Sequence, residues 1–492
     1  MNTTNETLQL IRAAQAKPLD ETLQKAWTQA TGLVNYDLQA PSLKLYPVIT
    51  PLRNMIARVG GNGGTATNWK AVTGINTTRV RPGVSEGNRG GIITTTVVSK
   101  VATYKGIGLE DSATFEADYA STGFEDVKVT AVEGLLRAVM IAEEELIVGG
   151  NGSLALGTCG TPTLAAVVGG GSLANSAHYV YCVVLTLDGY LSSTVAAGLP
   201  GNITRTNADG TTDTFGGGNS QVSSSATVTP AANGSIQASV TAIAGAVAYA
   251  WYWGTSTGAG STLGAITTAN SVLITVDAGT GTQAANDAKV AADYSVNALV
   301  FDGLITQIST SGSNSYYKAL ATGTPGVGTK LTTDNAGGVT EINTALKSFW
   351  DNYRLSPELI LVNAQELNSI TNLVVAAGGA PLFRFNMDNG GGTLNAGVIV
   401  GNYLNKFTMD GGSLVKVMLH PNVPPGTIIF YSKKIPYPLS NVTNVMQFKC
   451  RRDYYQIEWP VVARKYQYGV YVDEVLQNYF PPAFGLISNI SP

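Results

Sequence analysis

The sequence contains unusually little charge. Only 13% of its 492 residues are Asp, Glu, Lys or Arg, and the formal net charge at pH 7 is −3, whereas an average protein has about 25% charged residues. Without net positive charge the chain has no bulk electrostatic attraction to nucleic acid, which excludes a basic nucleic-acid-binding protein. The low charge, the 56 glycines and the abundant Thr, Ser and Asn instead predict a β-rich protein with many turns.

Residue types that carry catalysis or bind metals are also scarce. The chain has two histidines, His178 and His420, and neither has a cysteine or a paired acid near it in the sequence. Its three cysteines, Cys159, Cys182 and Cys450, are odd in number and widely spaced, which fits neither a disulfide framework nor a zinc site. We therefore expect buried free thiols, no enzymatic activity, no cofactor and no metal ion.

Two further absences bear on location. No run of about 18 or more apolar residues occurs, so we expect no membrane-spanning helix. The N-terminal sequence MNTTNETLQLIRAAQ has no basic segment followed by an apolar one, so we expect no secretory signal and predict folding and assembly in the cytosol.

Residues 59–111 predict a long, polar β-hairpin. Two arms, at about 66–80 and 91–108, contain Thr, Val, Ile and Tyr in short alternating stretches, which favours strands. Between them the sequence RPGVSEGNRGG is rich in turn residues. An arm of about 15 residues spans roughly 50 Å, and a two-stranded hairpin is only marginally stable by itself in water. We therefore predict that this hairpin has nothing of its own to fold onto and lies on another copy of the chain.

Residues 123–148 predict the longest helix, because apolar residues recur every three or four positions. Glu125 and Asp126 fall in its first turn, where the helix dipole favours acids, and the sequence GGNG at 149–152 ends it. The predicted core face comprises Phe124, Val127, Ala131, Leu135, Ala138, Ala142 and Leu146.

Clusters of charged residues have alternative interpretations. The three consecutive glutamates at 143–145 point in different directions on a helix, which favours a solvated or intersubunit face over a metal site. The basic pairs Lys433–Lys434, Arg451–Arg452 and Arg464–Lys465 can contact either DNA phosphates or acidic residues of neighbouring copies. We favour pairing with neighbouring copies.

The composition changes between residues 151 and 300, where only two basic and six acidic residues occur. Strand-like stretches separated by Gly, Ser and Asn predict an antiparallel β-sandwich at about 160–285, of immunoglobulin or fibronectin type. Asp188–Gly189 predicts a hairpin turn after the sequence HYVYCVVLTL. One face of a later strand is predicted to carry Val247, Tyr249, Trp251 and Trp253.

The sequence on either side of the sandwich indicates both helices and strands. Residues 1–58 predict a surface arm with two short helices, near 8–15 and 20–30. After the sandwich, helices are predicted at about 339–353 and 364–375, with a buried strand, ELILVNA, between them. From residue 414 onward the sequence is rich in predicted strands. The predicted fold class is therefore α+β.

The order of these segments resembles the major capsid protein of tailed bacteriophages, which has the Hong Kong 97-type fold. LIVGGNG at 146–152, FDGLITQI at 301–308 and DYYQIEWPVVARKYQYGVYVDEVLQNYF at 453–480 are similar to segments of that family. The resemblance covers about 1–158 and 290–492, and the sandwich is an insertion relative to it.

The resemblance implies an order of domains. It assigns an N-terminal arm (1–58), an extended loop (59–111), a long spine helix that begins a peripheral domain (112–158), the inserted immunoglobulin-like sandwich (160–285), an axial domain (286–413) and C-terminal strands shared by the axial and peripheral domains (414–492).

The resemblance also implies a structural role, in which hexamers and pentamers of the chain form the icosahedral head shell of a tailed phage with double-stranded DNA. The implied partners are other copies of the chain, scaffolding, portal and cement proteins, and packaged DNA held without sequence specificity on the inner face; no membrane is implied. The implied location is the virion, assembled in the cytoplasm of a bacterial host. Two alternatives stay open: an encapsulin-type compartment shell and, with less support, a secreted β-rich adhesin or surface-layer protein.

Particular residues are expected in these roles. Contacts between copies are expected at Arg79, Arg81, Glu86, Arg89, Glu143, Glu144, Arg451 and Arg452. The core of the spine helix is expected at Phe124, Val127, Ala131, Leu135 and Leu146.

Overall fold

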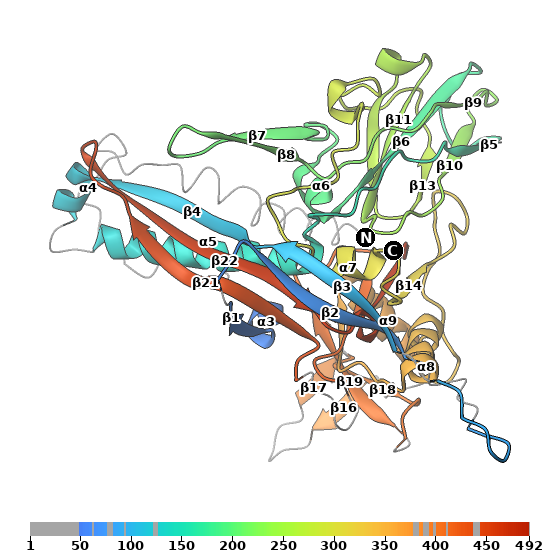
Figure 1. Cartoon of the computed structure of the whole chain (residues 1–492). Helices are drawn as coiled ribbons and strands as arrows, with labels where there is room; N and C mark the ends of the chain where they lie inside the picture. The colour runs from blue at the N-terminus through green and yellow to red at the C-terminus, as the bar shows by residue number, and fades with distance from the viewer. Residues whose placement is uncertain are drawn as a thin grey trace.

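The computed structural model describes residues 49–61, 63–75, 82–92, 95–121, 126–376, 383–386, 393–396, 400–409, 412–435 and 443–491. The fold is mixed α+β, and Figure 1 shows a long narrow wing, a central body and an upper lobe. The two short helices predicted near 8–15 and 20–30 lie outside the described residues. Within the described ranges, none of the helices combines the length and apolar character that crossing a bilayer requires.

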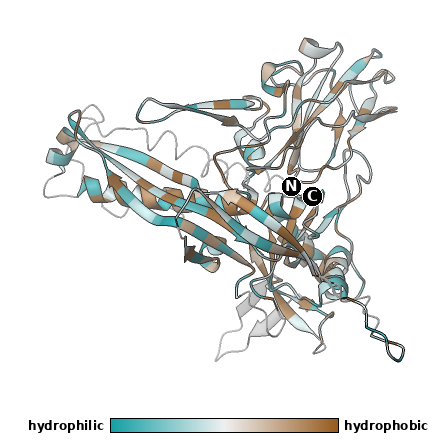
Figure 2. Cartoon of the chain, in the orientation of Figure 1, coloured by the Kyte–Doolittle hydropathy of each residue, from teal (hydrophilic) through white to brown (hydrophobic). Residues whose placement is uncertain are grey.

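The wing is a twisted four-stranded sheet with one long helix along it (Figure 1). β21 and β22 form a long antiparallel hairpin, β4 pairs antiparallel with β22, and β1 pairs parallel with β21. Hydrophilic and hydrophobic residues alternate along the long strands (Figure 2), as expected of a sheet with one covered face. In sheet order the strands are β1 (Ala57–Gly60), β21 (Met446–Glu458), β22 (Lys465–Asn478) and β4 (Lys105–Thr114).

The helix of the wing, α5 (Val127–Gly149), confirms the long helix predicted from the apolar period. It begins a few residues after the predicted start because Asp126 caps it. The Asp126 carboxylate accepts hydrogen bonds from the backbone N–H groups of Lys128 and Val129, at 3.0 and 3.3 Å. The helix ends at Gly149, the first residue of the predicted stop.

The apolar side of α5 packs on β22, where Leu135 and Val139 lie in one cluster with Tyr468, Val470 and Val472. Of the residues expected in the helix core, Val127 and Leu135 are buried, Ala131 and Leu146 are half-buried, and Phe124 lies outside the described residues.

The upper lobe is a two-sheet antiparallel β-sandwich (Figure 1). The core between its sheets includes Cys182, Ile236, Trp251, Trp253 and Ile274. The immunoglobulin-type relationship stays a prediction. One sheet has the order β13 (Ser271–Ile274), β10 (Ser235–Ser239), β5 (Thr163–Val167), and the other β12 (Thr262–Thr267), β11 (Ala248–Gly254), β6 (His178–Leu185), β9 (Ala226–Val228).

Two details of this lobe correct the sequence predictions. Asp188–Gly189 forms no hairpin turn, because it lies in helix α6 (Leu187–Ser192), whose N-cap Thr186 accepts a hydrogen bond from the Gly189 N–H at 3.3 Å. Tyr249, Trp251 and Trp253 do face the sandwich core. Val247 does not face the sandwich core. It lies just before the strand and just after a turn in which the Ala246 N–H donates to the Ile243 carbonyl.

The sheet that contains β11 is covered on both faces. All seven residues of β11 are buried. Its alternate residues Ala248, Ala250 and Tyr252 belong to the main core, the large cluster that continues into the body and includes Phe349 and Phe430. The lobe therefore shares one of its sheets with the rest of the chain.

The body is built on a six-stranded mixed sheet with helices packed against it. Helices α8 (Thr340–Tyr353) and α9 (Ala364–Ala376) confirm the two predicted helices, and β15 (Leu359–Val362) confirms the buried strand between them. The remaining strands, in sheet order around β15, are β14 (Tyr316–Ala319), β23 (Gly485–Ser488), β20 (Ile428–Tyr431), then β19 (Ser413–Leu419) and β18 (Asn402–Asn405). Strands after residue 412 thus divide between the body and the wing.

Short elements complete the described fold. The helices and 3-10 turns are α3 (Pro51–Met55), α4 (Phe115–Ala120), α7 (Leu304–Ser309), η3 (Gly258–Gly260), η4 (Ala288–Val290) and η5 (Pro481–Ala483). Three two-stranded ribbons are β2 (Ala66–Ile75) with β3 (Thr95–Thr103), β7 (Asn202–Thr206) with β8 (Thr212–Gly216), and β16 (Phe383–Asn386) with β17 (Thr393–Ala396).

Candidate assembly site

The extended hairpin, β2 and β3, is anchored to the body at its base. The Val72 N–H donates to the Tyr479 carbonyl at 2.9 Å, and the Trp69 Nε1–H donates to the Asn478 carbonyl at 2.9 Å. The Thr73 carbonyl accepts from the Asn314 amide at 2.7 Å. The prediction that the hairpin has nothing of its own to fold onto is therefore wrong for its base.

The second arm of the hairpin is also shorter than predicted. β3 ends at Thr103, and after Tyr104 the chain continues as β4 in the wing. The predicted arm at 91–108 is therefore split between two sheets, because Lys105 and the residues after it pair with β22.

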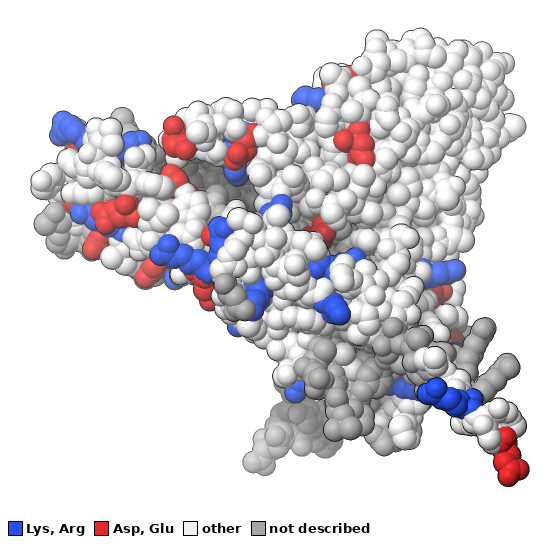
Figure 3. All heavy atoms as spheres, viewed as in Figure 1, with Lys and Arg blue, Asp and Glu red and all other residues white. Residues whose placement is uncertain are grey.

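The tip of the hairpin, Pro82–Ile92, is exposed at every residue. It is held as a turn by the Asn88 N–H, which donates to the Ser85 carbonyl at 3.1 Å. Figure 3 shows basic and acidic side chains gathered on this projection, away from the body. Glu86 and Arg89 make no ion pair with the other described residues, and Arg79 and Arg81 lie outside them.

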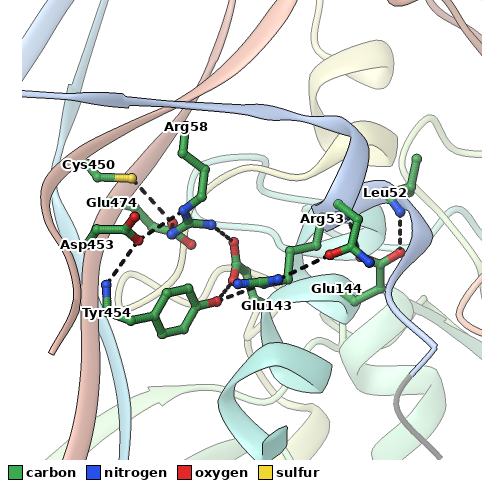
Figure 4. Close-up of polar contacts among 10 residues, drawn as sticks. Leu52, Arg53, Arg58, Glu143, Glu144, Cys450, Asp453, Tyr454 and Glu474 are labelled. Atoms are coloured by element: carbon green, nitrogen blue, oxygen red, sulfur yellow. Dashed lines mark hydrogen bonds and ion pairs between the residues drawn. The ribbon is translucent and has the colours of Figure 1, made fainter. Parts of the chain in front are cut away.

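A buried ionic cluster joins the N-terminal segment to the wing (Figure 4). Arg58, on β1, contacts three carboxylates: Glu143 at 2.5 Å, Glu474 at 2.6 Å and Asp453 at 3.0 Å. The side chains of Glu143 and Glu474 are fully buried. Further members are Arg53, whose Nε lies 3.0 Å from Glu143 and 2.9 Å from the Tyr454 hydroxyl, and Tyr454, which donates to Glu143.

Glu144, the next residue on α5, fixes the same segment through its backbone. Its carboxylate accepts from the N–H groups of Leu52 and Arg53, at 2.8 and 2.7 Å. It also accepts from His420 Nε2 at 2.7 Å, and His420 Nδ1 in turn accepts from the Asn422 N–H at 3.2 Å. Because Nδ1 accepts a hydrogen bond, the ring proton lies on Nε2.

These contacts correct the interpretation of the consecutive glutamates. Glu143 and Glu144 lie inside the chain and bind groups of the same chain, so the predicted solvated or intersubunit face is wrong for both. A charge in a low-dielectric interior needs partners, and the two arginines, the histidine and two backbone N–H groups supply them.

Burial and neighbouring charges shift the titration of this cluster. Burial raises the pKa of Glu474 to about 8, and repulsion from Glu143 adds to the shift. Burial alone would lower the pKa of Arg58, but Glu474 and Glu143 raise it above its ordinary value, so Arg58 stays charged. Burial also raises the pKa of the Cys450 thiol to about 12, so this thiol is protonated near neutral pH.

The basic pairs predicted from the sequence have different environments. Arg451 pairs with Asp473 across the β21–β22 hairpin at 2.7 Å, and the Arg452 guanidinium lies 3.9 Å from the centre of the Tyr455 ring. Arg464 pairs with Glu116 at 2.5 Å. These contacts lie within one chain, and contacts with another copy stay a prediction.

Both histidines have an acidic partner that the sequence did not indicate. His178 Nε2 lies 2.9 Å from Asp277, as His420 does at 2.7 Å from Glu144. The partners are 99 and 276 positions away, so no local pattern could have revealed them. Among the described residues, no group of three or more His, Cys, Asp or Glu is arranged to hold a metal ion. The three cysteines are free and buried, as predicted.

A buried carboxyl group outside the ionic cluster is expected to make stability depend on pH. Glu366 on α9 accepts from the Gly426 N–H at 2.8 Å through Oε1, while its buried Oε2 has no hydrogen-bond partner among the described residues. Burial raises its pKa to about 8 from an ordinary 4.5. Between these values the folded chain holds a proton that the unfolded chain has released, so this group lowers stability as pH rises from 4.5 to 8.

Replacing Glu366 by glutamine should remove that dependence. We expect the thermal unfolding midpoint of Glu366→Gln to rise relative to the wild type as the pH increases from 5 to 8, measured by differential scanning calorimetry. The matched control Glu133→Gln, at a half-exposed position on α5, should keep a constant difference from the wild type. A pH-independent difference for Glu366→Gln would show that this carboxyl group does not retain its proton.

No protein-family model and no curated protein matches the chain. Similar solved structures include the capsid of cyanophage A-1(L), with a TM-score of 0.41 and 12% identity over 94% of this chain and 100% of that chain. The capsid of Myoviridae phage XM1 has a TM-score of 0.37 and 10% identity over 93% of this chain and 100% of that one. The SrpI encapsulin complex of Synechococcus elongatus PCC 7942 has a TM-score of 0.37 and 8% identity over 94% of both chains. At these values the likeness establishes neither a family nor a function.

Proposed function

We propose that the chain is a structural subunit that assembles with copies of itself into a closed protein shell. The observation that carries this proposal is the hairpin, which is fixed to the body at its base and fully exposed at its tip. A two-stranded ribbon that leaves the body is marginally stable in water unless something covers it. In a shell of identical subunits, every tip meets the same surface of a neighbour.

The exposed apolar residues of the hairpin support the same proposal. Val97, Val98 and Val101 on β3 and Ile92 at the tip are all exposed, Ile92 at 90% of its surface. Apolar side chains gathered on a projecting ribbon mark a surface for a protein partner. A second copy of the same chain covers this surface, so the proposal needs no other protein.

The finer assignment follows the resemblance of the sequence to tailed-phage capsid proteins. In this finer assignment, the shell is the head of a virion and consists of hexamers and pentamers of the chain. It encloses double-stranded DNA and assembles with scaffolding, portal and cement proteins. The compartment shell is the competing assignment. Purified particles that protect nucleic acid from nuclease support the phage head, whereas particles that contain a folded protein cargo support the compartment.

Assembly should fail when the tip is removed, although the subunit should still fold. We expect a variant with Pro82–Ile92 replaced by a short Gly-Ser linker to remain a small species in sedimentation and to show no shells by negative-stain microscopy. Its circular dichroism should match that of the wild type, because the base of the hairpin keeps its bonds to Asn478 and Tyr479.

The matched control replaces another exposed turn, Asn207–Thr211 between β7 and β8, by the same linker. This variant should form shells of normal size. Normal shells from the tip variant would contradict the proposed role of the hairpin.

A further inference from the structure

His178 lies inside the sandwich, at the end of the lobe that is farther from the body. It is fully buried and begins β6, whose last residue, Leu185, belongs to the main core about 23 Å along the strand. His178 shares the face of Val180 and Cys182, which point into the sandwich core. None of the strands β5, β6, β9, β10, β11, β12 and β13 contains Asp, Glu, Lys or Arg. The imidazole is therefore the one side chain in these strands that can hold a positive charge.

Both ring nitrogens of His178 face oxygen atoms that accept hydrogen bonds. Nδ1 lies 2.9 Å from the Ser176 carbonyl oxygen, and Nε2 lies 2.9 Å from Oδ1 of Asp277. A carbonyl oxygen and an ionised carboxylate have no proton to donate. A neutral imidazole has one N–H and one lone pair, so it can donate to only one of the two oxygens. In a neutral ring, one nitrogen lone pair would face an oxygen lone pair inside the lobe.

Asp277 is ionised and therefore cannot supply the missing proton. Its Oδ1 also accepts from the Ala174 N–H at 2.7 Å, and its side chain is 44% exposed, so water solvates the charge as well. The hydrogen bond from Ala174 lowers the pKa of Asp277, and the hydrogen bond from His178 lowers it further. Two donors thus meet one carboxylate oxygen, and the second ring proton has to reside on the imidazole.

The contact between His178 and Asp277 joins the two sheets of the sandwich. His178 is on β6 in one sheet, and Asp277 follows β13, which belongs to the other. Trp253 on β11 holds the same segment, because its Nε1–H donates to the Val276 carbonyl at 3.0 Å. A charge in the interior is stable only when it is paired, so the pair fixes this end of the lobe in its closed form.

We propose that His178 is a doubly protonated imidazolium and forms, with the carboxylate of Asp277, a pH-sensitive clamp on the sandwich. The clamp is closed only while the carboxylate is ionised and the ring holds both protons. It concerns the folded chain and does not rest on the proposed shell.

The clamp opens on both sides of neutral pH. The pKa of Asp277 is lowered from 3.8, so its stabilising effect is complete above that value and is lost as the pH falls through the lower value of the folded chain. On the alkaline side the clamp opens when the ring releases a proton, because a lone pair then faces one of the two oxygens.

The other titratable groups near the pair are uncharged at neutral pH. The titratable side chains in the sandwich core are Cys159, Cys182 and Tyr249. Burial raises the pKa of the last two. Tyr179 and Tyr181 alternate with the imidazole along β6 and therefore point to the opposite face. The adjoining segments 172–177 and 271–276 contain no charged residue, so Asp277 is the charge that decides the state of the ring.

Nitrogen spectra of the histidines test the two protonation states directly. The chain has only His178 and His420, so sedimented protein labelled with ¹⁵N at histidine gives a simple solid-state NMR spectrum. At pH 7 both nitrogens of His178 should carry a proton. His420 is the internal control and should show one protonated and one bare nitrogen, as its hydrogen bonds require. The signals that vanish in His178→Gln assign the spectrum, and a bare nitrogen on His178 at pH 7 overturns the proposal.

Asp277→Asn tests whether the carboxylate keeps the ring charged. An asparagine amide can donate to Nε2, so His178 should become neutral in this variant, with one bare nitrogen at pH 7. Hydrogen exchange followed by mass spectrometry should be about tenfold faster in peptides covering 172–180 and 271–278, as expected for the loss of one hydrogen bond between charged groups.

The matched control is Asp213→Asn, which removes the charge of an exposed pair with Arg205 on the β7–β8 ribbon. It should leave the ring signals and the exchange of both peptides unchanged. A doubly protonated His178 in Asp277→Asn, or unaltered exchange, overturns the clamp. The wild-type chain supplies the same test if Asp277→Asn does not fold. Raising the pH until His178 shows a bare nitrogen should speed exchange of these peptides beyond the intrinsic effect of pH, and an absence of that change also overturns the clamp.

Discussion

Replacing Glu143 by alanine is expected to lower the free energy of unfolding by about 3–5 kcal/mol, the usual cost of removing one partner from a buried ion pair. Glu143 is fully buried and bridges Arg53 and Arg58. Without it, Arg58 keeps Glu474 and Asp453, but Arg53 loses the carboxylate it contacts. A loss of this size is a large fraction of the ~5–15 kcal/mol that stabilises a typical protein.

The measurement compares denaturant and thermal unfolding midpoints of Glu143→Ala with those of Asp213→Ala. Asp213 pairs with Arg205 at 2.8 Å on the β7–β8 ribbon, where both side chains are substantially exposed. Removing an exposed pair typically costs no more than about 1 kcal/mol. Equal effects of the two substitutions would show that the buried cluster contributes no more than a surface pair.

Truncating Trp251 or Tyr252 to alanine is expected to destabilise the fold by a similar amount. The two residues are neighbours on β11, and their side chains point to opposite faces of the sheet. Trp251 fills the core of the sandwich, and Tyr252 lies in the main core with its hydroxyl donating to Gln283 at 2.8 Å. Truncating a large buried aromatic side chain to alanine costs about 3–5 kcal/mol. Trp251→Ala and Tyr252→Ala should therefore each lower the thermal unfolding midpoint by a similar amount.

Tyr119→Ala is the matched control, because Tyr119 is 79% exposed on α4. It should change stability by no more than about 0.5 kcal/mol. If Tyr252→Ala behaved like this control, the sandwich would be a module that packs only on itself, and its outer sheet face would contribute nothing to the main core.

The elements that local patterns determine could be predicted from the sequence. The apolar period located α5, α8 and α9, and alternation with Gly-rich turns located the sandwich. One exception was α6, because the Asp–Gly pair within it is a signal of a hairpin turn. The N-cap Thr186 stabilises the helix instead, because its side chain accepts a hydrogen bond from the Gly189 N–H.

The candidate site could be predicted only in part, because its contacts join distant segments. The turn residues indicated the exposed tip correctly. The partners of Glu143 could not be found, since Arg58 lies 85 positions before it and Tyr454 lies 311 positions after it.

The strand order of the wing also sets when this part of the chain can form during translation. β1 and β4 are made early, but both hydrogen-bond to strands that begin only at Met446. A ribosome that adds ~5–20 residues per second needs about 15–65 s for the roughly 330 residues between β4 and β21. Throughout that interval α5 has no completed sheet to pack on. A nascent chain therefore cannot complete the wing until the C-terminal strands have left the ribosome.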